Sequence, residues 1–296
     1  MQSGTPPGVR FIRSGTAARD IVPRSMTATT TLDDDTALVP AGDGVWEGGI
    51  APGWDTPRGP LGGYVMAILV RGLELAVADP ERSARSITTH FLRTPDDGPV
   101  TVSAQVERAG RSLSTVSGRL EQDGKLIALA LAAYSKPWPS PLLADATIPD
   151  VEPPEDERRP LQEDFPRSDR PPFLARMSMQ PRFGAAPFSS ADRAEVGGWL
   201  GLLERRPLDA LALVVLADAW FPAPWPRLTG LAPAPTIDLT VHFRATLPLP
   251  DSILLGRFHS SLTRDGFFDE DGELWLPDGT LVAQSRQLGL LLGASA

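Results

Sequence analysis

The chain has 296 residues, 42% of them hydrophobic, enough for one large or two medium domains with a proper core. It has no cysteine, which excludes disulfides, a thiolate nucleophile and a cysteine metal site, and its three histidines lack metal-ligand spacing. The formal net charge of −9 argues against a nucleic-acid groove, although local arginines and helix N-termini can still hold an anionic small ligand.

Targeting features are also missing from the sequence. No apolar run has the length needed to span a bilayer, and no apolar core follows the basic residues near the N-terminus. We therefore expect a cytoplasmic protein without a membrane span, a metal or a cofactor.

Residues 1–40 are predicted to form a disordered N-terminal extension. They contain Pro6-Pro7, a run of threonines and the acidic triplet Asp33-Asp34-Asp35. Met26 precedes a plausible beginning for a folded protein, so we hypothesise that translation starts there. N-terminal sequencing of the native protein tests this, and finding Gln2 in the mature chain would contradict it.

A first folded unit is predicted over residues 41–139. Gly62-Gly63 interrupts the chain, and residues 64–77 are apolar on almost every helical face, which predicts a helix buried on most sides. Apolar residues then alternate along three predicted strands, and Asp-Gly supplies the positive φ that a type I′ hairpin turn needs between the last two. These strands cover residues 100–106, 113–120 and 125–134.

A proline-rich linker is predicted over residues 140–172, as a solvated connection to a second unit over residues 173–296. In this second unit, residues 207–220 read as the counterpart helix, with Asp218 as the one acid near its end. Strands are predicted at residues 199–202, 236–244, 253–263, around 274–275, and 281–292.

The two units share a sequence repeat. A Thr-x-His-Phe core occurs in residues 88–91 and again in residues 240–243, so that Thr88 matches Thr240. Each copy follows a helix-like segment and precedes an alternating run with an Asp-Gly hairpin. We interpret this as one α+β unit duplicated in tandem, each copy an antiparallel sheet wrapped around a long central helix.

Six short motifs, in the same order along both units, are similar to the type II, TesB-like acyl-CoA thioesterases over roughly residues 45–296. In the first unit, the helix opening resembles Phe-Gly-Gly, and two later segments resemble Tyr-Phe-Leu-Arg and Gly-x-Ser-Phe. In the second unit, three segments resemble Ser-Asp-x-Asn-Phe, Thr-Ile-Asp and Val-Ala-Ser-Thr-Val-Gln-Glu-Gly. The matching segments begin at Leu61, Ser86, Gly110, Ala217, Thr236 and Val282.

This resemblance implies a double hotdog fold and hydrolysis of acyl-CoA to free acid and CoA. It also implies that Asp218, Thr236 and Gln287 orient the hydrolytic water. Trp220 stands where the family has an asparagine, and Leu288 where it has a glutamate. These two differences bear on the shape of the substrate more than on the chemistry.

The residue types agree with these roles. Asp218 is a lone carboxylate in an apolar run, and a carboxylate is a competent general base for water. Thr236 begins a strand, where its hydroxyl can donate to one partner and accept from another. Gln287 is one of several polar residues on a predicted central strand, with Gln284 as a rival on the opposite face.

Substrate binding is assigned to Gly62, Gly63 and Tyr64. N–H groups at the start of a helix can polarise a thioester carbonyl, and glycine lets the backbone approach a ligand closely. We expect acyl-CoA as the partner and further association of two chains, because hotdog units usually pair their sheets.

Three alternatives to hydrolysis stay open. The chain could be a non-hydrolytic acyl-thioester binder, a scaffold protein without activity, or a hotdog hydratase. A hydratase would need a histidine beside an acid, and His90 is the only histidine near Gly62-Gly63. Asp269-Glu270-Asp271 is interpreted as a solvated turn.

Overall fold

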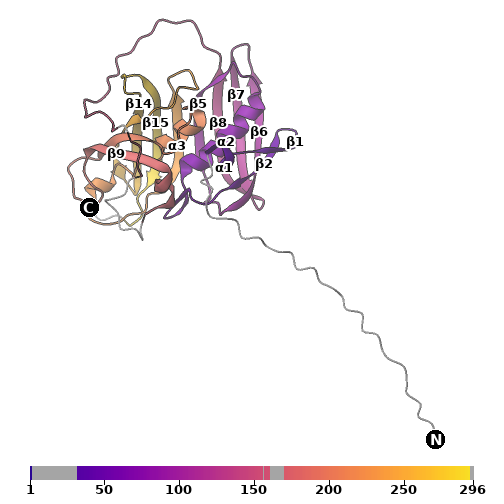
Figure 1. The fold of residues 1–296 in the computed structure, drawn as a ribbon, viewed down its shortest axis with the longest axis horizontal. Helices are drawn as coiled ribbons and strands as arrows, with labels where there is room; N and C mark the ends of the chain where they lie inside the picture. Colours follow the sequence, from indigo (N-terminus) through magenta and orange to yellow (C-terminus); the bar gives the residue numbers. More distant parts are fainter. Residues whose placement is uncertain (2–31, 156, 161–169, 294–296) are drawn as a thin grey trace. The chain divides into compact units, whose positions relative to one another are not determined.

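The computed structural model describes residues 1, 32–155, 157–160 and 170–293. In this part of the chain, thirteen strands form one antiparallel sheet in the order β1-β2-β6-β7-β8-β5-β11-β15-β14-β12-β10-β9, and β13 pairs with β14. Figure 1 shows helices α2 and α3 side by side, with sheet strands around them. The chain therefore has the predicted α+β double hotdog architecture.

The N-terminal half follows the predicted order of one helix and then an antiparallel meander. The three predicted strands of the meander are confirmed, and Asp123 and Gly124 between the last two have φ values of 51° and 71°, as a type I′ turn requires. The elements are α1 (Leu32–Asp35), β1 (Val39–Gly42), β2 (Val45–Ile50), β3 (Asp55–Thr56), β4 (Gly59–Pro60), α2 (Gly62–Val77), β5 (Ser83–Phe91), β6 (Gly98–Ala109), β7 (Leu113–Gln122) and β8 (Lys125–Ser135).

Helix α2 is the centre of this half. Every residue from Gly63 to Val70, about two turns, is buried, as the all-round apolar pattern predicts. The helix ends at Ala78, which adopts the left-handed conformation with φ 47° and donates its N–H to the carbonyl of Glu74.

The C-terminal half repeats the arrangement with a shorter helix. Its elements are η2 (Pro172–Arg176), β9 (Met177–Gly184), β10 (Glu195–Leu202), α3 (Ala210–Ala217), η3 (Trp225–Arg227), β11 (Thr236–Phe243), β12 (Leu254–His259), β13 (Thr263–Arg264), β14 (Phe267–Trp275) and β15 (Leu281–Leu290). The helix predicted over residues 207–220 is thus only eight residues long. Asp209 caps its start by accepting the N–H of Ala212, and Asp218 is the residue that ends it.

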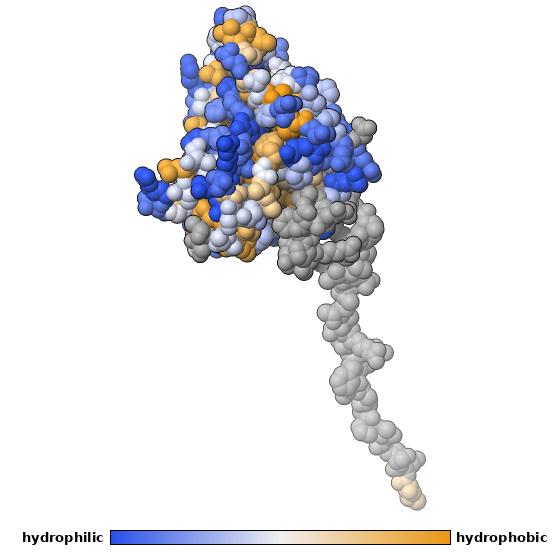
Figure 2. All heavy atoms as spheres, turned by 90° about the vertical axis from the view of Figure 1, so that its left-hand side faces the viewer, coloured by the Kyte–Doolittle hydropathy of each residue, from blue (hydrophilic) through white to orange (hydrophobic). Residues whose placement is uncertain are grey.

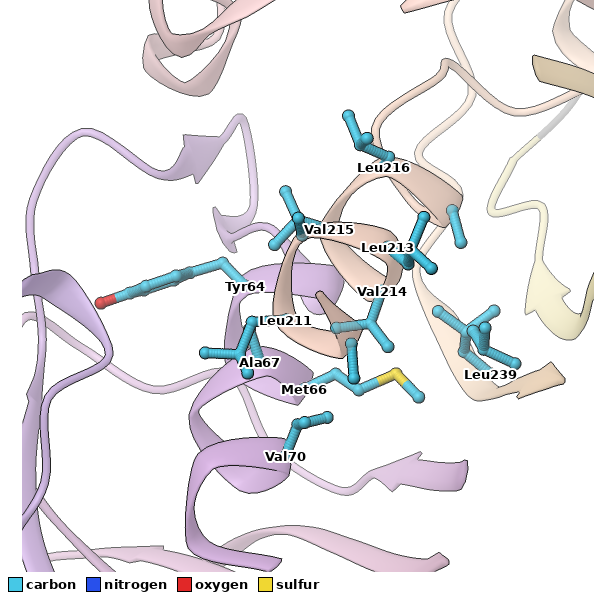
Figure 3. Close-up of a cluster of buried hydrophobic side chains, with 14 of the residues drawn as sticks. Tyr64, Met66, Ala67, Val70, Leu211, Leu213, Val214, Val215, Leu216 and Leu239 are labelled. Carbon is cyan, nitrogen blue, oxygen red and sulfur yellow. The ribbon is translucent and has the colours of Figure 1, made fainter. Parts of the chain in front are cut away.

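The two halves meet at β5 and β11, which pair antiparallel. Thr88 lies directly opposite Thr240 in this ladder, and their Oγ1 atoms are 2.9 Å apart. The two threonines that match in the sequence repeat therefore touch at the junction of the halves. Helix α2 packs against α3, with Met66, Val70 and Val214 among the buried side chains near their contact (Figure 3).

The disordered extension predicted over residues 1–40 reaches too far along the chain. Residues 32–35 form α1 and residues 39–42 form β1, with Leu32 only 2% exposed. Asp35 accepts a hydrogen bond from Trp54 Nε1 at 2.8 Å, which fixes this segment to the body. The remainder of the extension, residues 2–31 with Met26, lies outside the described residues.

Part of the predicted linker is packed rather than solvated. Ile148 and Val151 contact the buried side chains of Trp199 and Trp275. Trp199 also donates its indole N–H to the carbonyl of Glu152 at 2.8 Å. The boundaries of the two units stay a prediction, since the chain from residue 148 already packs on the C-terminal half.

No helix among the described residues is long and apolar enough to cross a membrane. In the space-filling view, hydrophobic residues are interspersed with hydrophilic ones (Figure 2).

Candidate active site

The start of α2 meets the end of α3 at a short contact between the halves. The backbone N–H of Gly63 donates to Asp218 Oδ2 at 2.6 Å. Leu61, which precedes the helix, makes no side-chain capping bond, so the carboxylate takes the place of a cap. A negative charge is favoured there by the dipole of α2.

This close approach leaves little room for a side chain at Gly62 and none at Gly63. A Cβ built on Gly62 would lie 3.0 Å from Asp218 Oδ2, and one built on Gly63 would lie 2.6 Å from the carbonyl oxygen of Val214. Any side chain at Gly63 would therefore push the two helices apart. The Gly-Gly pair thus allows an end-to-end contact of two helices as well as the tight turn.

Asp218 is held in a state suited to proton transfer. It is half-buried, and burial raises its pKa from the ordinary 3.8 to about 7, while the hydrogen bond from Gly63 opposes that rise. A carboxylate with a pKa near neutral can both accept and return a proton at physiological pH.

Thr236 and Gln287 are brought into direct contact. Thr236 Oγ1 donates to Gln287 Oε1 at 2.7 Å, and the side chain of Gln287 is buried. The rival Gln284 lies apart from them, because it accepts the Nε–H of Arg244 at an exposed position. Of the two glutamines, Gln287 is therefore the one whose side chain lies in the protein interior beside Thr236.

Glu270 belongs to the same group, although the sequence reading placed residues 269–271 in a solvated turn. That reading is wrong: these residues lie in the middle of β14, and Glu270 is only 5% exposed. It stands opposite Gln287 in the ladder and accepts Gln287 Nε2–H at 2.6 Å. Its second oxygen accepts the N–H of Ala223 at 2.6 Å.

The three predicted catalytic residues thus form two groups. Within the described part of the chain, Asp218 makes no hydrogen bond to Thr236 or Gln287. Its charge does act on Glu270, whose pKa is raised to about 7 mainly by burial and further by Asp218. The segment that follows α3 carries both Asp218 and Ala223, which is how the two groups are joined along the chain.

Tyr64 lies on the other side of α2. Its ring stacks on Trp54 with centroids 4.8 Å apart and points away from α3 (Figure 3). Its hydroxyl donates to the carbonyl of Asp35 and accepts the N–H of Ala51, both at 2.9 Å. These contacts pack the Tyr64 side chain against Trp54 and the segment before α2, and its predicted part in substrate binding stays a prediction.

The two repeat histidines are exposed. His90 and His242 occupy positions of β5 and β11 that alternate with buried neighbours such as Thr89 and Val241. His90 stands opposite Asp238 in the β5–β11 ladder, on the exposed face of these strands.

The acyl-CoA thioesterase N-terminal domain matches residues 50–135, and the acyl-CoA thioesterase C-terminal domain matches residues 149–291. No curated protein matches the sequence.

Among solved structures, a provisionally named thioesterase II from Thermobifida fusca is 31% identical, with a TM-score of 0.73 over 90% of this chain and 99% of its own. A hot dog fold protein of unknown function from Alicyclobacillus acidocaldarius is 27% identical, with a TM-score of 0.79 over 91% and 99%. The acyl-CoA thioesterase II TesB2 from Mycobacterium marinum shares the fold at 19% identity, with a TM-score of 0.69 over 88% and 98%.

Proposed function

Because this chain belongs to the acyl-CoA thioesterase family, a family of thioester hydrolases, we propose that it cleaves acyl-CoA to a free acid and CoA with Asp218, Thr236 and Gln287 around the attacking water. The observation that carries this proposal is the 2.6 Å hydrogen bond from Gly63 to Asp218. It sets a carboxylate of near-neutral pKa beside the start of a helix, where a carbonyl oxygen can be polarised.

In the first step, Asp218 accepts a proton from a water molecule as the water oxygen bonds to the thioester carbon. The Thr236 hydroxyl donates a hydrogen bond to Gln287 Oε1, so the lone pairs of the hydroxyl are left to accept a hydrogen bond from the water. The second N–H of the Gln287 amide is free of Glu270 and can donate to the water oxygen.

The oxyanion that forms needs a donor. Gly63 cannot supply it, since its N–H is taken by Asp218. The N–H of Gly62, the first residue of α2, makes no hydrogen bond to a described residue and donates to the oxyanion instead. When the carbonyl re-forms, the C–S bond breaks, and Asp218 returns its proton to the departing thiolate of CoA.

The test is a panel of acyl-CoA thioesters of graded chain length with detection of free thiol. We expect thiol release, and a loss of kcat of about a hundredfold or more in Asp218→Asn, as for removal of a general base. Asp145→Asn, at an exposed position, is the matched control. Binding of acyl-CoA without thiol release would identify a binder instead, and unchanged turnover in folded Asp218→Asn would remove Asp218 from the mechanism.

A further inference from the structure

Four groups form one hydrogen-bonded chain behind the proposed water site. Thr236 Oγ1–H donates to Gln287 Oε1 at 2.7 Å, and Gln287 Nε2–H donates to Glu270 Oε1 at 2.6 Å. The N–H of Ala223 donates to Glu270 Oε2 at 2.6 Å. Both oxygens of the Glu270 carboxylate are therefore occupied by donors, in a place that is almost closed to solvent.

Glu270 decides which way the amide of Gln287 faces. An amide can present either its oxygen or its NH₂ to a neighbour, whereas an ionised carboxylate only accepts. With Ala223 on one oxygen, the carboxylate takes an N–H from Gln287 on the other. The amide oxygen is then directed to Thr236, which fixes the direction of the threonine proton.

We propose that Glu270 is a positioning residue of the hydrolytic site, whose carboxylate holds the Gln287 amide in the orientation that turns the lone pairs of Thr236 toward the attacking water. This role rests on the proposed hydrolysis. It adds a fourth side chain to the site, and that side chain acts on the water only through Gln287 and Thr236.

Protonation of Glu270 reverses the direction of the hydrogen bonds in this series. A protonated carboxyl has an O–H to donate, so the amide turns its oxygen to Glu270 and its NH₂ to Thr236. Two charged groups act on Glu270 from the elements around it: Asp218, after α3, and Asp269, on β14. Asp269 points outward, accepting the N–H groups of Ser261 and Leu262 and contacting Arg286.

The active form consequently has both Asp218 and Glu270 ionised. Burial raises the pKa of each to about 7, so both protons are lost over the same pH range. Two required ionisations give a steeper fall of activity toward acid than one general base does. This steepness is a signature that a purely structural glutamate would not produce.

The experiment is the pH profile of kcat/KM for an acyl-CoA that the wild type hydrolyses. On the acid side we expect the slope of log kcat/KM against pH to approach about two in the wild type and about one in Glu270→Gln. At pH 8 we expect kcat of Glu270→Gln to fall at least about tenfold, because a glutamine there forces the reversed amide, with KM nearly unchanged. Glu273→Gln is the matched control. Glu273 lies on the same strand but stands opposite Gln284, so it is not one of the four hydrogen-bonded groups.

A slope of one in the wild type overturns the proposed role of Glu270 without any variant. A folded Glu270→Gln protein with wild-type kcat and an unchanged pH profile overturns it too. In both cases thiol release by the two proteins leaves the hydrolase assignment intact. Absence of thiol release from the wild type over the whole acyl-CoA panel overturns the proposed function, and the role of Glu270 with it.

Discussion

Gly63 donates its backbone N–H to the carboxylate of Asp218 over 2.6 Å, although the two residues stand 155 positions apart in the chain. The contact joins the start of one repeat's helix to the end of the other's. Neither half could form this arrangement alone, because the glycine comes from the first half and the acid from the second.

Replacing Gly63 with alanine should damage both fold and activity. The new Cβ would lie 2.6 Å from the Val214 carbonyl oxygen and 2.9 Å from Val215 Cα, and both are backbone atoms that cannot swing away. We expect a loss of about 1–3 kcal/mol in the free energy of unfolding, measured by chemical denaturation. The displacement of Asp218 should lower kcat by at least about tenfold.

Gly230→Ala is the control for this change, since its Cβ would meet no atom within 4 Å. It should keep both stability and kcat. If Gly63→Ala and Gly230→Ala have the same free energy of unfolding and the same kcat, the close approach of α2 and α3 is not required for stability or activity.

Removing the charge of Asp218 should stabilise the protein at alkaline pH. Its pKa is raised from 3.8 to about 7, so the folded state binds more protons than the unfolded state between about pH 4 and pH 7. The wild-type free energy of unfolding should therefore fall as pH rises through this window. Asp218→Asn keeps an oxygen for the Gly63 N–H without a buried charge, and should gain about 1–3 kcal/mol at pH 8.

Urea denaturation of wild type and Asp218→Asn at pH 5 and pH 8 measures this effect. The advantage of the asparagine variant should shrink at pH 5, where the folded wild type carries a protonated Asp218. A constant difference between the two proteins at both pH values would contradict a raised pKa.

Most of the architecture could be predicted from the sequence because its signals are local. Alternation along β6 and β7 and the Asp123-Gly124 turn each act within a few residues. The repeat then indicated that Thr88 and Thr240 are equivalent, and the structure places them face to face. The helix predicted over residues 207–220 was too long at both ends. Asp209 caps the start of α3, and the backbone leaves the helical conformation at Asp218, where φ is −116° and ψ is 2°, although apolar residues continue beyond it.

What the sequence missed depends on partners far away in the chain. Three consecutive acids look hydrophilic, and only the pairing of β14 with β15 shows that Glu270 faces Gln287. Leu32 and Asp35 likewise resemble the low-complexity residues before them until Trp54 and Arg176 are placed beside Asp35. Gln287 was assigned from the family resemblance, with support from the polar residues that interrupt an otherwise apolar strand, and its catalytic role stays a prediction.

Thr236 and Gln287 should act as one unit in catalysis. Thr236→Val removes the hydroxyl at nearly constant volume, and Gln287→Ala removes its acceptor. We expect each single variant to lose at least about tenfold in kcat, and the double variant to lose little more than the worse single, as for residues that work together. Steady-state kinetics of the four proteins measures the coupling, with Thr101→Val on β6 as control. Multiplicative losses would mean that the two side chains contribute independently.

Asp35 should hold the N-terminal segment to the body without taking part in the chemistry. It is buried, accepts the Trp54 indole N–H at 2.8 Å and lies 3.3 Å from Arg176 Nη1, while Arg176 covers the Trp54 ring at 4.8 Å. Asp35→Ala leaves a buried indole N–H and a half-buried guanidinium without this acceptor, which should cost about 1–3 kcal/mol. We expect a lower Tm and a nearly unchanged kcat at 25 °C, because the linked ring of Tyr64 points away from α3. Asp192→Ala, at an exposed position, controls for the loss of a charge. A large fall in kcat in a protein of wild-type Tm would instead make the segment from Leu32 to Asp35 part of the active site.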